Sequence, residues 1–195
     1  RSWPARGSSG RSWAGSEGGL MALPGRRGPV RIVCMDPDAS PRVRLTADDP
    51  RPGSRPATST EGPHRQLDQR SSPELWGRLV AAVFALDGVE EGHSTVSPAT
   101  SRAVHLTGRP EERTPEVNLS PGRRWEPVHL HGVDDTSVHL VLAPERGVRL
   151  AELGWLEPHG YADFGTEWML YGPRDEAELA VVVGIIEESL AYARG

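Results

Sequence analysis

The sequence predicts an α+β fold, with an antiparallel sheet packed against about three helices and a long disordered N-terminal tail. Three observations lead to this prediction. Helical spacing of apolar residues occurs three times, strand-like alternation fills the region between the first two of these stretches, and the first 70 residues lack a sustained period. We therefore expect residues 1–70 to be a basic tail or linker and residues 71–195 to be one folded domain.

The expected tail is distinguished by its composition. It carries 12 arginines against seven acidic residues, and its only strand-like run is VRIVCM at residues 30–35. Around that run Gly, Ser, Pro, Arg and Asp follow one another without a period, which is typical of a linker. We assign no stable structure to residues 1–70 and keep residues 30–35 as a candidate for an added edge strand.

The expected domain is acidic, and its charge disfavours some partners. Residues 71–195 hold ten arginines against 20 acidic residues, whereas nucleic-acid binding needs clustered positive charge. No apolar run approaches the ~20 residues that span a bilayer, and no signal peptide is recognisable. Cys34 is the single cysteine, so no intrachain disulfide can form. We expect a cytoplasmic protein without nucleic-acid or membrane partners, and the oligomeric state stays open.

Three helices are expected in the domain. The first spans residues 73–86 and follows Ser72 as its N-cap. The second begins at Pro144, and the third follows Asp175, whose spacing to Glu178 predicts a capping box. The apolar residues available for burial on and just after these helices are Leu75, Leu79, Val80, Val83, Phe84, Val148, Leu150, Leu153, Trp155, Leu179, Val183, Ile186 and Leu190.

Short extended segments account for the sheet. Residues 89–97 and 101–107 are expected strands, and residues 116–119 are a further candidate. Residues 166–171 predict another strand after the second helix, whereas residues 157–160 are expected to form a loop.

The stretch WEPVHLHGVDDTSVHLVLA, residues 125–143, organises the whole prediction. Alternating Val and Leu on both sides of a polar turn predict two paired strands. His129 and His131 are two residues apart and share a face of the first strand. A three-residue turn would put His139 opposite His131, whereas a two- or four-residue turn would put it opposite Leu130, on the other face. The turn therefore decides whether the three histidines cluster.

These histidines are the candidate site. Histidine serves acid–base catalysis near neutral pH and binds transition metals, so His129, His131, His139 and His159 could be catalytic or could be metal ligands. They could equally be exposed or hydrogen-bonded structural residues. No phosphate-binding loop, dinucleotide fingerprint, Gly-x-Ser-x-Gly elbow or zinc-binding cysteine set is present.

The C-terminal part also resembles a known family. A His-x-His strand, a returning Leu-His-Leu-like strand, Gly-Trp, a further histidine and Thr-Glu-Trp…Tyr-x-Pro-Arg resemble the luciferase-domain family of fungal luciferases and their bacterial homologues. The pattern falls on His129 and His131, His139, Gly154-Trp155, His159, and Thr166-Glu167-Trp168…Tyr171-Gly172-Pro173-Arg174. The resemblance is faint over residues 73–120 and does not extend to residues 1–70.

The resemblance implies an oxidation. Fungal luciferases oxidise a hydroxylated hispidin-type pyrone with molecular oxygen, emitting light without a nucleotide or flavin, so no cofactor and no metal are expected. A histidine would take the acidic enol proton, and oxygen would attack the resulting anion. Histidines or Arg174 would stabilise the negative charge, while Trp155, Trp168 or Tyr171 would flank a flat ring, although such aromatic residues commonly belong to the core.

Three hypotheses follow. The first is a luciferase-domain protein that binds a small aromatic or pyrone-like molecule at the histidines and catalyses cofactor-independent oxidation or related acid–base chemistry. The second is a non-catalytic interaction or ligand-sensing domain with structural histidines, and the third is a metal-dependent enzyme that uses the same histidines. The absence of lysine indicates a GC-rich coding sequence, and we expect a bacterial member of the family.

Overall fold

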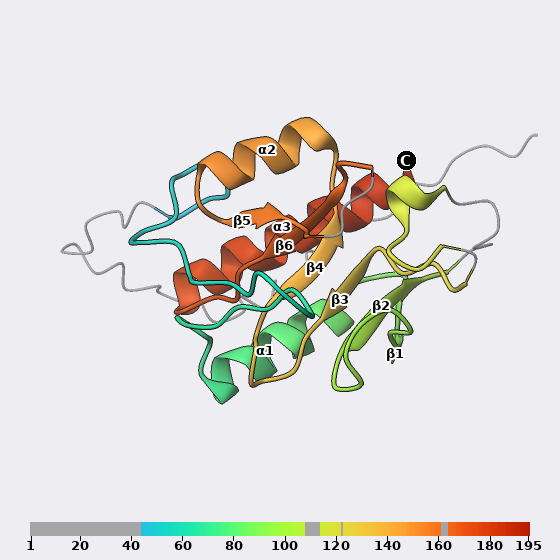
Figure 1. The fold of residues 1–195 in the computed structure, drawn as a ribbon, viewed down its shortest axis with the longest axis horizontal. Helices are drawn as coiled ribbons and strands as arrows, with labels where there is room; N and C mark the ends of the chain where they lie inside the picture. Colours follow the sequence, from blue (N-terminus) through green and yellow to red (C-terminus); the bar gives the residue numbers. More distant parts are fainter. Residues whose placement is uncertain (1–43, 108–113, 122, 161–163) are drawn as a thin grey trace, which may run out of the picture. The chain divides into compact units, whose positions relative to one another are not determined.

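A six-stranded sheet forms the centre of the protein, in a computed structural model that describes residues 44–107, 114–121, 123–160 and 164–195 (Figure 1). All described residues belong to one compact unit, Arg42–Gly195. Every neighbouring pair of strands is antiparallel, and the strand order is β1-β2-β3-β4-β6-β5. The strands are β1 (Val89–His93), β2 (Arg102–Leu106), β3 (Val128–Leu130), β4 (Val138–Val141), β5 (Leu156–Pro158) and β6 (Glu167–Leu170). The predicted α+β architecture is thus confirmed.

Three α-helices occur where the sequence predicts them. They are α1 (Pro73–Phe84), α2 (Pro144–Glu152) and α3 (Glu176–Arg194). The side chains of Ser72 and Asp175 act as N-caps, since each accepts a hydrogen bond from a first-turn N–H group. The Glu178 carboxylate does not complete a capping box, because it accepts hydrogen bonds from Arg51 and Arg174 instead.

The two faces of the sheet differ in chemistry because side chains alternate along each strand. One row of cross-strand partners runs through Ala103, His129, His139, Met169 and Glu157. The row one residue along runs through Val104, Val128, Leu140 and Trp168 on the opposite face, and these four side chains are buried in the hydrophobic core. Helix α3 contacts β3 and β4 and also packs against α1. The helices therefore cover the apolar face.

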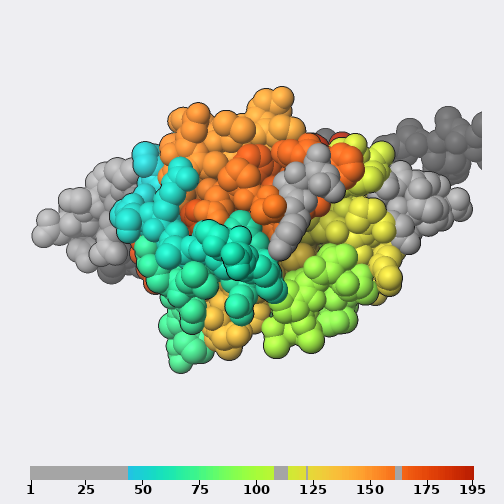
Figure 2. Space-filling model, viewed as in Figure 1, coloured from blue at the N-terminus to red at the C-terminus, as the bar shows by residue number. Residues whose placement is uncertain are grey.

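Residues 44–70 belong to the same compact unit as the sheet, so the folded domain begins before the expected boundary at residue 70, and the part of this segment around His64 and Gln66 lies on the histidine face. Arg51 and Gln66 are buried, and the backbone N–H of Gln66 donates to Asp135 at 3.0 Å. Figure 2 shows this segment, in cyan to teal, spread over the face turned to the viewer. Polar hydrogen bonds rather than an apolar stripe hold the segment, so no period reveals it. The rest of the expected tail, including the run at 30–35, lies outside the described residues.

Two smaller predictions also differ from the structure. Residues 115–117 form a short 3-10 helix (η2, Pro115–Val117) instead of a strand over 116–119. Part of the expected loop at 157–160 is strand β5, which pairs with β6 at the edge of the sheet. An edge strand tolerates the missing N–H of Pro158, which is why a proline here is compatible with pairing.

The buried faces of α2 and α3 are slightly rotated from those expected. Val148 is exposed, and the α2 residues that lie buried are Gly147 and Leu150. On α3, Val182 is buried and Val183 is only partly buried. Among the described residues, no helix is long and apolar enough to cross a membrane.

Candidate functional site

Five imidazoles gather on the histidine face of the sheet, and we call them the histidine cluster. His139 lies at its centre, with ring centroids 4.3 Å from His131, 4.5 Å from His159, 5.0 Å from His129 and 6.0 Å from His64. The rings of His129 and His131 stack almost in parallel, at 3°. The structure therefore brings together all four histidines selected from the sequence and adds His64, which the sequence prediction missed.

The hairpin turn is longer than either alternative considered from the sequence. His139 pairs with His129, and the N–H of His131 donates to the carbonyl of Ser137 at 3.0 Å, which leaves five residues, 132–136, in the turn. Thr136 adopts a left-handed φ of 59° inside it. Because an odd number of turn residues preserves the face, His139 still points to the same side as His129.

Two buried carboxylates, those of Glu126 and Asp135, form hydrogen bonds with the Nδ1 atoms of His129 and His131. The Nδ1 of His129 lies 2.9 Å from Glu126, and the Nδ1 of His131 is hydrogen-bonded to Asp135. Burial opposes the charge of Asp135, but hydrogen bonds from His131, Ser137 and the Gln66 backbone outweigh it and hold the pKa of Asp135 below its ordinary value. Both histidines therefore donate from Nδ1, and their Nε2 atoms carry the lone pair.

His64 belongs to a second hydrogen-bonded group. Its Nε2 lies 2.6 Å from Glu157, and Glu157 also accepts a hydrogen bond from the Tyr171 hydroxyl at 2.7 Å. The backbone carbonyl of His64 lies 3.0 Å from Nε2 of His139, so His139 donates from that nitrogen. The segment 44–70 thereby fixes the orientation of the central imidazole.

Burial controls the charge of the cluster. It lowers the pKa of His129, and the hydrogen bond to Glu126 only partly opposes this effect. Burial, together with the charges that neighbouring imidazoles would carry, lowers the pKa of His139 well below its ordinary value. The same causes lower the pKa of His159 to about 4. These three imidazoles are neutral at pH 7 and can accept a proton or bind a cation.

Two adjoining cavities meet the cluster. The smaller, of 70 Å³, is lined by all five imidazoles together with Pro63, Val96, Ser97 and Pro98. The larger, of 300 Å³, is lined by His129, His139, His159, Glu167, Val96, Leu119, Pro121 and Phe164. Val96 and Phe164 are about half exposed, at 53% and 47%, so an apolar rim borders the imidazoles. A pocket of this kind suits a small, flat organic molecule.

The other residues selected from the sequence lie away from these cavities. Trp155 and Trp168 both belong to the buried core, Trp168 on the apolar face, and Trp155 donates to the Asp49 carbonyl at 2.8 Å. Tyr171 is fully buried. Arg174 pairs with Glu178 and lines neither cavity. Sequence spacing alone does not separate such core aromatics from pocket residues.

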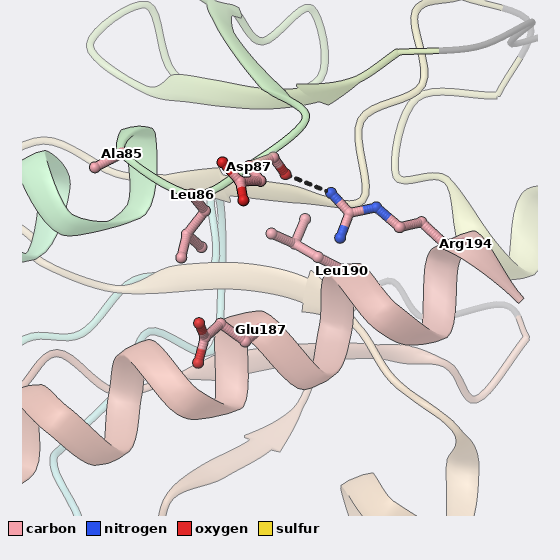
Figure 3. Close-up of a pocket in the computed structure, with 6 residues that line it drawn as sticks. All are labelled: Ala85, Leu86, Asp87, Glu187, Leu190 and Arg194. Atoms are coloured by element: carbon pink, nitrogen blue, oxygen red, sulfur yellow. Dashed lines mark hydrogen bonds between the residues drawn. The ribbon is translucent and has the colours of Figure 1, made fainter. Parts of the chain in front are cut away.

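A third hollow, of 360 Å³, lies between the end of α1 and α3 (Figure 3). Leu86 and Leu190 line it, and Arg194 donates to the carbonyl of Asp87 at 2.9 Å. Figure 3 shows no histidine among its labelled residues. Its cation already has a partner, so this hollow offers less chemistry than the histidine cluster.

Comparison with known proteins supports the sequence resemblance. Residues 124–189 match the family model described as luciferase domain. Luciferases of Armillaria mellea and Armillaria gallica are 33% and 31% identical to the chain over 160 residues, which cover 73% of this chain and 60% of each relative. A luciferase of Neonothopanus nambi is 40% identical over 73 residues, or 34% of this chain and 27% of that protein. No solved structure matches the chain significantly.

The residues that match the family model include most of the candidate site. The matched range 124–189 includes four members of the histidine cluster, all except His64. The chain spans 60% of the length of the Armillaria relatives, and these relatives are fungal, so a bacterial source stays a prediction. On the family match and these identities together, the chain belongs to the luciferase-domain family.

Proposed function

We propose that the protein is an oxygen-dependent oxidoreductase that binds a small, acidic, aromatic or pyrone-like molecule in the 300 Å³ cavity. The observation that carries this proposal is the meeting of neutral imidazoles with an apolar rim, since His139 and His159 lie beside Val96 and Phe164. An apolar rim favours a flat ring, and a neutral imidazole can accept its acidic proton.

The low imidazole pKa values constrain the substrate. An imidazole with a pKa of about 4, as for His159, is a weak base toward an ordinary alcohol or ketone. It can deprotonate an enol that is itself acidic, and the bound enolate then raises the imidazole pKa by attraction between opposite charges. We therefore expect a substrate of the hydroxypyrone or cyclic 1,3-diketone type.

His159 is the best candidate for the base. Its Nδ1 lies 3.5 Å from the carboxylate of Glu167, which would stabilise the imidazolium once it forms. In the oxidation itself, an enolate carbon would give two electrons to molecular oxygen and form a C–O bond. The resulting peroxide anion would take the proton from the imidazolium, so that substrate and oxygen combine into a hydroperoxide.

Oxygen uptake tests this proposal. Purified protein is mixed with a panel of acidic enols, and uptake is followed with an electrode for the wild type, His159→Gln and the control His93→Gln. General-base catalysis contributes about 10²–10⁴-fold, so uptake should fall by at least tenfold in His159→Gln. His93 lies exposed on β1 and lines neither cavity beside the cluster, so its substitution should have no effect.

Binding without oxygen uptake would favour the non-catalytic alternative, a ligand-sensing domain, over an enzyme. Equal uptake by the wild type and by a folded His159→Gln variant would contradict the assigned base. If no acidic enol binds or is oxidised, the proposed substrate class is wrong.

A further inference from the structure

We propose that His129, His131 and His139 together bind one divalent transition-metal ion, although the family resemblance implies none. One ring nitrogen from each of the three lies within 4.8 Å of the nitrogens of the other two, and all three residues are buried. Nitrogens bound to one ion at about 2.1 Å lie at most about 4.2 Å apart, so a small movement of the rings completes the site.

The hydrogen bonds already present select the nitrogens that would bind. Glu126 and Asp135 hold the Nδ1 atoms of His129 and His131, so the free lone pairs lie on Nε2. Among the described residues, both Nε2 atoms are buried without a hydrogen-bond partner. Histidines that bind metals commonly donate one ring N–H to a carboxylate and bind the ion with the other nitrogen. His129 and His131 have this arrangement.

The third ligand is prepared in a different way. His139 donates from Nε2 to the backbone carbonyl of His64, so its lone pair is on Nδ1. Histidine binds metals through an unprotonated ring nitrogen of this kind. A buried ring nitrogen without a hydrogen-bond partner is unfavourable, and an ion shared among the three would supply the missing partner.

A second triad, formed by His64, His139 and His159, satisfies the same distance limit. It is the weaker candidate because both ring nitrogens of His64 are already engaged. Nε2 lies 2.6 Å from Glu157, and Nδ1 accepts a hydrogen bond from the Gly160 N–H at 3.3 Å. The two triads share His139, so the arrangement favours a single ion at the first.

The donor atoms limit the identity of the ion. Imidazole nitrogen suits Zn²⁺, Fe²⁺, Co²⁺, Ni²⁺ or Cu²⁺, whereas Ca²⁺ and Mg²⁺ prefer oxygen. The carboxylates of Glu126 and Asp135, which are hydrogen-bonded to His129 and His131, would offset the charge of the ion. Three protein ligands leave a fourth position open, and His129, His131 and His139 all line the 70 Å³ cavity.

This inference deepens the proposed function, since an ion there would adjoin the cavity assigned to the substrate. It can nevertheless be tested without any substrate. Metal binding without oxygen uptake would leave the site in place and remove the proposed reaction. Oxygen uptake by metal-free protein would leave the reaction in place and show that it does not require the site.

Metal titration of untagged, EDTA-treated protein tests the site. Zn²⁺ and Co²⁺ should bind at one ion per chain in calorimetry, with a four-coordinate visible spectrum for Co²⁺. His131→Gln should abolish this binding, and Glu126→Gln should weaken it by about 10–100-fold, because it removes the carboxylate behind His129. The matched control His93→Gln removes an exposed histidine that belongs to neither triad and should leave the affinity unchanged.

Anomalous diffraction from zinc-soaked crystals of the wild type locates the ion even if a variant fails to fold. A peak among the rings of His129, His131 and His139 supports the proposal. No binding of either ion, or a peak beside His64 and His159, would overturn it. Unchanged binding in a folded His131→Gln variant would also overturn it.

Discussion

Acidification should destabilise this protein at a pH where most proteins are still stable, because its central histidines are buried and neutral. The pKa values of His129 and His139 lie below the ordinary value, chiefly through burial. In the unfolded chain both return to about 6.5. Below that pH the unfolded state binds more protons than the native state, so the free energy of unfolding falls as the pH falls.

The magnitude follows from the number of protons involved. Each such histidine lowers the free energy of unfolding by about 1.4 kcal/mol per pH unit once the pH is well below 6.5. His159, with a pKa of about 4 in the native state, should alone account for a loss of about 1.6 kcal/mol between pH 6.5 and 5, and the lowered pKa values of His129 and His139 add to the loss in the same direction. Asp135 and Glu157 have lowered pKa values, and their stabilisation is lost only below about pH 4.5.

Urea unfolding followed by tryptophan fluorescence at pH 8.0, 6.5, 5.5 and 5.0, with EDTA present, measures this loss. His139→Asn should reduce the slope of the free energy of unfolding against pH by the equivalent of about one bound proton. His93→Asn is the matched control, because His93 lies exposed outside the cluster, and it should keep the wild-type dependence. Constant stability from pH 6.5 to 5 would refute the reasoning, as would an equal change in both variants.

Two further predictions concern the fold. Gly147→Ala would place a methyl group onto the Trp168 indole and should lower the free energy of unfolding by about 1–3 kcal/mol. An unchanged midpoint of urea unfolding would show instead that α2 moves without cost. Arg51→Met removes a buried partner of Glu178 and should lower the free energy of unfolding by about 3 kcal/mol. Arg78→Met removes one partner of an exposed ion pair and should lower it by under about 1 kcal/mol. Similar losses in the two variants would contradict the burial of Arg51.

The local elements were predictable because their signals are local. Ser72 and Asp175 mark helix starts through side-chain caps, which depend on a few adjacent residues. The hairpin around His129 and His139 follows from apolar alternation on both sides of a polar turn. The turn length was not predictable, since it depends on the hydrogen bonds that Asp135 accepts from Gln66 and Ser137.

The site was only partly predictable, because its remaining parts come from distant segments. His64 lies 75 residues before His139 and belongs to a stretch without a sequence period. Val96 and Phe164 at the rim carry no motif, and their position appears only once the loops pack over the sheet. Trp168 was assigned to the ligand from the family pattern, but it pairs with Leu140 on the apolar face.

The central claim is that the lone pairs of three buried imidazoles converge on one hollow, and imidazole ¹⁵N NMR of the metal-free protein tests it most directly. We predict that His129 and His131 are protonated on Nδ1, that His139 is protonated on Nε2, and that the three unprotonated nitrogens shift together when Zn²⁺ is added. Protonated Nε2 atoms on His129 and His131, or a zinc titration that leaves all three unprotonated nitrogens unmoved, would contradict the account.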